Sequence, residues 1–270
     1  MKVKKNIKKK NIVRSLRKVG LKKGDTVFVH LDISTIGLIT GGIKKSLEIY
    51  YQSIITVIGK KGTISAPAYF WEFNKNNLVF DINKSPISNK LGLFPKFLNN
   101  LKGSYLSPNP MSSVVAIGKN AKLICSKKTG SAYGVDSPFD VLTKLNAKML
   151  FLGVDLRYMT YVHYVEHMVG VPHRYFKYFC HHVYDNGKKI KIPIISYVKF
   201  LKFNITGNIK ANNKKFESAR LVKKVNIGNS NIRCLEFKKT YEFLKRKIQR
   251  NCFYLLKKKP NFKKGQIPLS

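Results

Sequence analysis

The chain has 270 residues, of which 44% are hydrophobic and 12% aromatic, a composition typical of a folded globular protein and not of a disordered one. It contains no uninterrupted run of about 18 apolar residues, so the sequence predicts no membrane-spanning helix. The formal net charge of +39 disfavours cationic partners and favours anionic ones, but it does not restrict the fold.

The N-terminal half of the chain alternates between helical and strand-like patterns. Helices are predicted where apolar residues recur at helical spacing, and strands where short apolar runs are bounded by turn residues. In chain order the sequence predicts a helix over 8–19, a strand over 26–30, a polar turn over 31–42, a helix around 47–55, a strand over 63–69, a loop over 73–90 and a helix around 92–100.

The second half continues this alternation and then changes character. The sequence predicts a strand over 113–117, a helix over 138–145, a strand over 148–154, a helix over 160–169, a hairpin over 178–195 and a basic helix over 238–258. Asn186-Gly187 is the two-residue signal of a type I′ hairpin turn. Alternating strands and helices predict an α/β fold with a mostly parallel or mixed sheet covered by helices. We expect one domain over 1–270, with a basic segment over 1–23 and a hairpin and basic helix added over about 176–270.

The turn after the first strand has the composition of an anion-binding site. It runs from His30 to Gly37, includes Ser34 and Thr35, and leads to a glycine pair at 41–42. Backbone N–H groups are free where a strand feeds a helix N-terminus, and glycines let the backbone approach a ligand. The turn lacks the GK[ST] of a P-loop and the G-x-G-x-x-G of a dinucleotide-binding turn, so an ordinary capped turn is the alternative.

A second group of polar residues follows the apolar strand predicted at 148–154. His163, Glu166 and His167 lie at helical spacing, so a helix places them on one face. Imidazole titrates near neutral pH, and a neighbouring carboxylate can fix its tautomer and raise its basicity. The segment follows a predicted strand, and α/β proteins bind ligands at the carboxyl ends of their strands. We therefore expect a general base at a ligand site here, and the alternative is that these histidines are structural.

The same residues spell H-x-x-E-H, a zinc-peptidase pattern in which two histidines bind the metal and the glutamate is the base. A catalytic zinc needs a third protein ligand, and the acids downstream of His167 are only Asp185, Glu217, Glu236 and Glu242. We therefore expect no metal, and a zinc hydrolase is an alternative of another class.

The excess of basic residues raises questions about partners and location. Clustered lysines bind nucleic acids, and polybasic segments attach to anionic membranes, but a coding bias toward Lys, Asn and Ile would give the same composition. Because no reader motif accompanies the charge, a nucleic-acid-binding protein is an alternative and no specific nucleic-acid partner is expected. Peripheral membrane contact and a homodimer are further hypotheses. Four scattered cysteines and the absence of a secretory signal pattern predict a cytoplasmic location.

Six segments occur in a recognisable order: GDTVFVHLDISTIG, GTISAPAYF, SPNPMSSVVAIGKNA, YGVDSPFDVL, KMLFLGV and TYVHYVEH. Together they resemble the aminoglycoside 3-N-acetyltransferase family, also called the antibiotic acetyltransferases. The resemblance runs from about residue 9 to 175, with a weaker echo in VNIGNSNIRCLEF. It implies a three-layer α/β/α sandwich with a mixed sheet, which binds acetyl-CoA and an amine in a ternary complex.

The resemblance also implies roles for particular residues. His163, in a T-x-x-H-x-x-E segment, would be the base that deprotonates the acceptor amine, with Glu166 as its carboxylate partner. The cofactor-binding residues that it implies are His30, Ser34, Thr35, Gly37, Ser112, Ser113 and Thr160. These positions predict an acetyl-CoA site between the first turn and the base.

The chain departs from the drug-modifying members of this family. Those members usually carry His-Pro where this chain has Asn109-Pro110, and His-Ser where it has His30-Leu31. They tend to bind cationic drugs in acidic pockets, whereas this chain has only 13 acidic residues. We therefore expect an N-acetyltransferase that acts on a nucleotide-linked amino sugar for surface-polysaccharide synthesis, and an aminoglycoside is the alternative acceptor.

Overall fold

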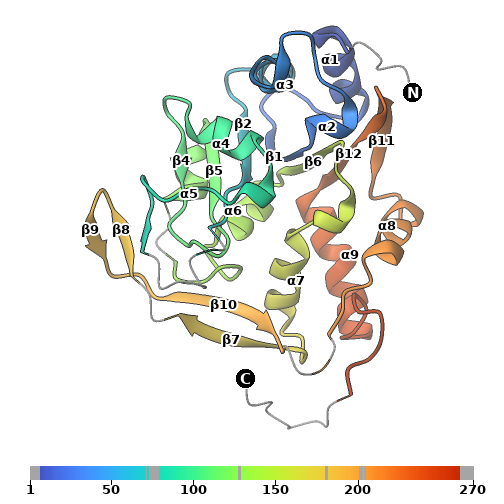
Figure 1. Cartoon of the computed structure of the whole chain (residues 1–270). Coiled ribbons are helices and arrows are strands. Elements are labelled where there is room, and N and C mark those ends of the chain that lie inside the picture. Colours follow the sequence, from blue (N-terminus) through green and yellow to red (C-terminus); the bar gives the residue numbers. More distant parts are fainter. Residues whose placement is uncertain are drawn as a thin grey trace.

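The computed structural model describes residues 7–70, 72, 79–126, 129–179, 182–200, 203 and 205–261. Its centre is a seven-stranded sheet with helices on both faces (Figure 1). The strands of this sheet are β1 (Thr26–Leu31), β2 (Thr63–Pro67), β4 (Tyr105–Leu106), β5 (Val114–Gly118), β6 (Lys148–Leu152), β11 (Lys223–Ile227) and β12 (Ser230–Glu236).

Parallel and antiparallel pairs both occur in this sheet. The strand order is β11-β12-β6-β1-β2-β5-β4, and β1 is parallel to both β2 and β6. The outer pairs, β2 with β5 and β6 with β12, are antiparallel. The predicted mixed sheet is therefore confirmed, but the sequence pattern did not predict β11 and β12, which extend it at one edge.

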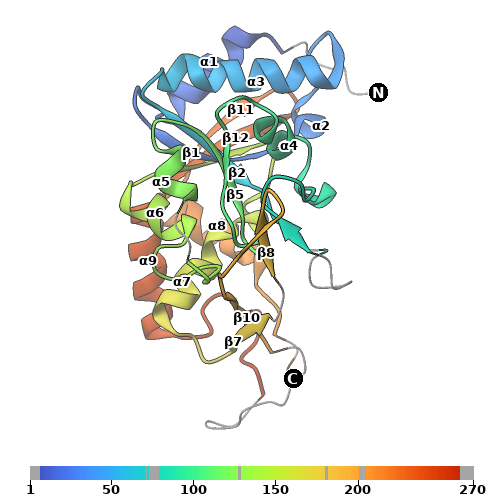
Figure 2. The same cartoon turned by 90° about the vertical axis from the view of Figure 1, so that its left-hand side faces the viewer.

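Helices cover the sheet in two layers, as Figure 2 shows edge-on. One face carries α1 (Lys9–Lys18) and α3 (Gly42–Ile58), and the other carries α5 (Ala121–Cys125), α6 (Pro138–Lys144), α7 (Tyr161–Val169) and α9 (Phe237–Arg250). Val27 and Val29 pack into the first core, whereas Phe28 packs into the second. Successive residues of a strand point to opposite faces, so an uninterrupted apolar run supplies both cores at once. The predicted three-layer α/β/α sandwich is confirmed.

Shorter helical segments connect these layers. They are α2 (Ile33–Ile36), α4 (Phe94–Asn99), α8 (Ile209–Ser218) and the 3₁₀ turns Asn89–Leu91 and Leu156–Tyr158. The basic helix predicted over 238–258 ends earlier, because the backbone is extended at Asn251. Leu255 is buried in the core although it lies in the turn after α9, so its apolar side chain made the helix look longer in the sequence. Among the helices of the described residues, none combines the length and the hydropathy that a membrane crossing requires.

Two small sheets lie beside the main one. The first pairs β7 (Arg174–Phe179) with β10 (Ile194–Lys199), and the second contains β3 (Phe80–Asp81), β8 (Val183–Asp185) and β9 (Lys188–Ile190). Asn186 and Gly187 have φ values of 51° and 80° between β8 and β9, which confirms the type I′ turn. The pairing of the predicted hairpin over 178–195 is confirmed, because Phe179 pairs with Ile194 and Val183 with Ile190. Its outer and inner parts belong to different small sheets, which the sequence did not predict. Residues 73–78 of the predicted loop lie outside the described residues.

Candidate active site

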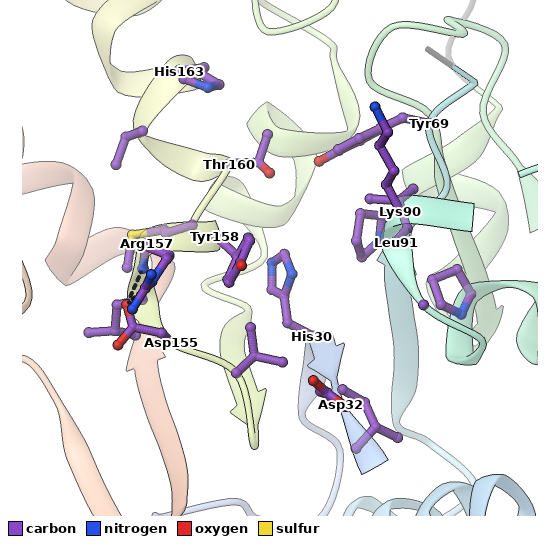
Figure 3. Close-up of a pocket in the computed structure, with 18 of the residues that line it drawn as sticks. His30, Asp32, Tyr69, Lys90, Leu91, Asp155, Arg157, Tyr158, Thr160 and His163 are labelled. Atoms are coloured by element: carbon purple, nitrogen blue, oxygen red, sulfur yellow. Dashed lines mark hydrogen bonds and ion pairs between the residues drawn. The ribbon is translucent and has the colours of Figure 1, made fainter. Parts of the chain in front are cut away.

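A cavity of about 1410 Å³ opens where the parallel strands β1 and β6 end. Its wall includes the residues that follow each of these strands and the first turns of α7 (Figure 3). Part of β10 also lines it. Open α/β sheets bind ligands in the crevice outside the carboxyl ends of their strands. The cavity is therefore the candidate active site.

The turn between β1 and α2 forms part of the cavity wall. Asp32 caps α2, because its Oδ1 accepts hydrogen bonds from the Ser34 backbone N–H at 2.9 Å and from Ser34 Oγ at 2.5 Å. Thr35 Oγ1 donates to the Gly153 carbonyl oxygen at 2.6 Å, which joins this turn to the end of β6. At Gly153, where φ is +70°, a Cβ would lie 2.2 Å from Thr35 Oγ1. Of the residues predicted to bind the cofactor in this turn, Ser34 and Thr35 line the cavity. Gly37 ends α2 and lies outside the cavity wall.

His30 lies in the cavity wall among aromatic rings. Its ring stacks on Phe151 with centroids 4.8 Å apart and meets Phe28 edge-on. Burial lowers the pKa of His30 to about 4. The side chain is therefore neutral at physiological pH, and it can supply a hydrogen bond to a ligand but no positive charge.

Helix α7 carries both residues of the predicted base. His163 Nδ1 lies 3.3 Å from Glu166 Oε2. The His163 side chain is 36% exposed, whereas that of Glu166 is only 4% exposed. Thr160, immediately before α7, also lines the cavity. The structure thus brings the imidazole to the cavity wall and places its carboxylate partner behind it.

Two residues that the sequence did not single out complete the surroundings of Glu166. Arg174, the first residue of β7, places Nη2 2.8 Å from Glu166 Oε2 and 2.8 Å from Nδ1 of His163. Its Nη1 donates to the Tyr197 carbonyl oxygen at 3.0 Å. On the other side, His173 Nε2 lies 3.1 Å from Glu166 Oε1. Each carboxylate oxygen of Glu166 therefore has a partner.

These contacts determine the protonation states of the group. Burial acts to raise the pKa of Glu166, but its contacts with His163 and His173 and the charge of Arg174 hold that pKa well below its ordinary value. Burial, followed by the charge of Arg174, lowers the pKa of His163 against the opposing effect of Glu166. At neutral pH the carboxylate is ionised and the imidazole is neutral, the charge state that a general base needs.

Ser112 and Ser113, which the resemblance places near the cofactor, lie away from the cavity wall. Both are fully buried. Ser112 Oγ donates to the Ala132 carbonyl oxygen at 2.7 Å, and Ser113 Oγ donates to that of Pro110 at 3.5 Å. The structure gives the two hydroxyls a role in holding the turn before β5, and not a position that faces a ligand.

The H-x-x-E-H pattern would require a set of metal ligands. In the described ranges of the chain, no three His, Cys, Asp or Glu side chains lie close enough to hold an ion. The ring of His167 lies against Phe176 and Tyr197 instead. The histidines of α7 therefore differ in their surroundings: His163 faces the cavity, and His167 packs against aromatic rings.

Comparisons with known proteins point to one family of acetyltransferases. The sequence profile of the aminoglycoside 3-N-acetyltransferase family matches residues 28–249. Aminoglycoside N(3)-acetyltransferase III of Salmonella sp is 28% identical over 182 residues, and this match covers 62% of each chain, less than two thirds of the relative. Aminoglycoside N(3)-acetyltransferase IX of Micromonospora chalcea is 25% identical over 201 residues, which cover 68% of this chain and 70% of the relative.

Solved structures share the fold at lower identity. The crystal structure of aminoglycoside acetyltransferase AAC(3)-Xa has a TM-score of 0.79 and 20% identity, and the alignment covers 91% of this chain and 93% of that one. AAC-IIIb in a binary complex with CoASH has a TM-score of 0.77 and 20% identity, with 90% and 97% covered. Since the family profile matches from β1 into α9, this chain belongs to the aminoglycoside 3-N-acetyltransferase family.

Proposed function

We propose that the protein is an acetyl-CoA-dependent N-acetyltransferase that acts on an amino group of a sugar. The observation that carries this proposal is the pair formed by His163 and Glu166, with the imidazole at the wall of a large cavity and the carboxylate buried behind it. Membership of the acetyltransferase family supports acetyl transfer to an amine as the reaction in which this pair acts.

The chain's own residues account for the proton transfers of that reaction. The acceptor reacts as its free amine, and His163 takes a proton from the nitrogen as the C–N bond to the acetyl carbonyl carbon forms. Glu166 stabilises the imidazolium that results, because its negatively charged carboxylate lies 3.3 Å from Nδ1 of the ring. When the C–S bond breaks, the imidazolium returns the proton to the leaving sulfur. One proton thus moves from nitrogen to sulfur, and His163 ends neutral.

The cavity wall also suits a polyanionic co-substrate. Lys90, Arg157 and Lys199 line it, and cations attract the phosphates of CoA. Among the predicted cofactor-binding residues, His30, Ser34, Thr35 and Thr160 line the same cavity. We therefore assign acetyl-CoA to it, with these four side chains as candidate contacts.

Two classes of acceptor are supported by different observations. The relatives are named as aminoglycoside acetyltransferases, which favours an aminoglycoside over the nucleotide-linked amino sugar expected from the sequence. The net charge of +39 favours the nucleotide-linked amino sugar, whose phosphates it attracts. We propose the aminoglycoside as the first acceptor to test and the nucleotide-linked amino sugar as the second.

The test measures release of the CoA thiol with each acceptor, and mass spectrometry of the product locates the acetyl group. We expect His163→Ala to lower turnover by about 10²–10⁴-fold, the usual contribution of a general base. His167→Ala, one helical turn away and outside the cavity wall, is the matched control and should retain turnover. Transfer by His163→Ala at the wild-type rate would contradict the assigned base, and absence of transfer by the wild type to both acceptors would contradict the proposed function.

A further inference from the structure

One nitrogen of the proposed base has two competing partners. Nδ1 of His163 lies 3.3 Å from Glu166 Oε2 and 2.8 Å from Arg174 Nη2. A neutral imidazole carries a single ring proton, so Nδ1 either donates to the carboxylate or accepts from the guanidinium. In the first state Nε2 has a free lone pair and can act as a base. In the second state the proton is on Nε2, which then cannot accept one.

We propose that Arg174 is a positioning residue that controls which nitrogen of His163 carries the proton, by competing with Glu166 for Nδ1. This inference rests on the proposed function of His163 as the base. The guanidinium contact is the shorter of the two, and a guanidinium N–H is always available as a donor because the group stays protonated. In the ligand-free protein His163 therefore holds its proton on Nε2.

The geometry of Arg174 suits this role. Its side chain is 12% exposed, and Nη1 is fixed by the Tyr197 carbonyl oxygen at 3.0 Å. The other amino group, Nη2, has two hydrogens, one for Glu166 Oε2 and one for Nδ1 of His163. Arg174 and Tyr197 belong to the paired strands β7 and β10, so the hairpin formed by these strands positions the guanidinium.

The change to the reactive state is a balanced exchange of protons. Arg174 keeps its bond to Glu166 Oε2 and withdraws from Nδ1 of His163. The imidazole gives its Nε2 proton to water in the cavity and takes one from water at Nδ1, which then donates to Glu166. The net charge of the site is unchanged, and the lone pair of Nε2 becomes free for the acceptor amine.

The charged groups near His163 come from three elements. Glu166 is on α7, Arg174 on β7 and Lys199 on β10, and both cations lower the pKa of the imidazole. The ring of Tyr133 also faces it at 5.6 Å between centroids, and burial raises the pKa of that phenol to about 12, so it is neutral. Lys199 Nζ donates to the Ile205 carbonyl oxygen and not to His163. Lys199 is therefore a matched cation that affects the charge of the site without sharing Nδ1.

Nitrogen-15 NMR of the histidine side chains tests the inference, because the two ring nitrogens shift differently in each tautomer. In the ligand-free wild type we expect His163 to show an unprotonated Nδ1 and a protonated Nε2. In Arg174→Met the proton should move to Nδ1, and the pKa of His163 should rise because a cation is lost. Lys199→Met should also raise the pKa, but it should keep the wild-type tautomer.

Arg174→Lys provides a second variant in case the methionine substitution prevents folding, which circular dichroism would show. Lysine keeps the charge but lacks the fork that reaches Tyr197, Glu166 and His163 together, so we expect a larger fraction protonated at Nδ1 with little change in pKa. A wild type already protonated at Nδ1, or the same tautomer in all four proteins, overturns the inference. The NMR experiment needs no turnover, so failure of the transfer assay would count against the proposed function alone.

Discussion

Replacing Glu166 with Gln is expected to lower the free energy of unfolding by about 3 kcal/mol at neutral pH. The substitution keeps the size of the side chain and removes its charge, which leaves Arg174 without its anionic partner. The Glu166 side chain is 4% exposed and that of Arg174 is 12% exposed. Removing one member of a buried ion pair costs about 3–5 kcal/mol. We expect the lower end, because Arg174 keeps its contacts with the Tyr197 carbonyl oxygen and with His163.

The effect of this substitution should depend on pH in a defined direction. The pKa of Glu166 is lower in the folded protein than in the unfolded chain, so its ionisation stabilises the fold. This contribution is fully present above the unfolded pKa of about 4.3 and is lost as the pH falls toward the folded pKa. The difference between the wild type and Glu166→Gln should therefore shrink as the pH falls below about 4.

Urea denaturation at several pH values measures this difference directly. Glu217→Gln is the matched control, because Glu217 is 44% exposed and lies 3.9 Å from Lys224 on the surface. It should change the free energy of unfolding by less than about 0.5 kcal/mol. A loss below about 1 kcal/mol for Glu166→Gln at pH 7, the size typical of a surface pair, would refute the reasoning. A loss that persists unchanged in acid would refute the assignment of that loss to the charge.

Three further predictions concern the proposed base, the turn before β5 and the turn after β6. The lowered pKa of His163 predicts an acidic limb below 6.5 in kcat/KM, measured with saturating acetyl-CoA and corrected for the separately measured ionisation of the acceptor amine; a limb above 6.5 that remains after this correction would contradict it. Ser112→Ala should lower the free energy of unfolding by about 1–3 kcal/mol, since it leaves the Ala132 carbonyl oxygen without its donor, and should leave the KM for acetyl-CoA unchanged. A raised KM would show that Ser112 contributes to cofactor binding after all. Gly153→Ala should weaken acetyl-CoA binding by about tenfold or more in calorimetry, because φ is +70° and the added Cβ meets Thr35 Oγ1. Unchanged affinity would show that this turn does not bind acetyl-CoA.

The central strands could be predicted from the sequence because their burial leaves a local signal. In β6, Met149 and Phe151 pack into one core and Leu150 and Leu152 into the other, so no polar residue interrupts the run. The edge strand β11 gives no such signal, because most of its side chains are exposed or half-buried. Its pairing with β12, and that of β12 with β6, are contacts between distant segments, which local periodicity does not encode.

The same reasoning explains which site residues were missed. His163 and Glu166 lie one helical turn apart, so helical spacing alone brings them together. Arg174 and His173 come after the end of α7, and the direction of the chain beyond Gly170 decides whether they return to Glu166. A usable signal was present, since a carboxylate on the buried side of a helix needs donors at both oxygens and His163 can serve only one. After His167, which packs against aromatic rings, the next basic side chains in the sequence are His173 and Arg174, and the structure places both beside Glu166.

The sign of a salt effect distinguishes the two proposed acceptors. The net charge of +39 repels a polycationic aminoglycoside and attracts a nucleotide-linked sugar, and added salt screens both interactions. Inside the cavity, Asp155 is paired with Arg157 and Glu166 with Arg174, so these carboxylates offer a cation little uncompensated charge. With added salt we therefore expect the KM for an aminoglycoside to fall and the KM for a nucleotide-linked amino sugar to rise. An aminoglycoside KM that rises with salt would show that local carboxylates such as Asp32 outweigh the charge of the whole chain.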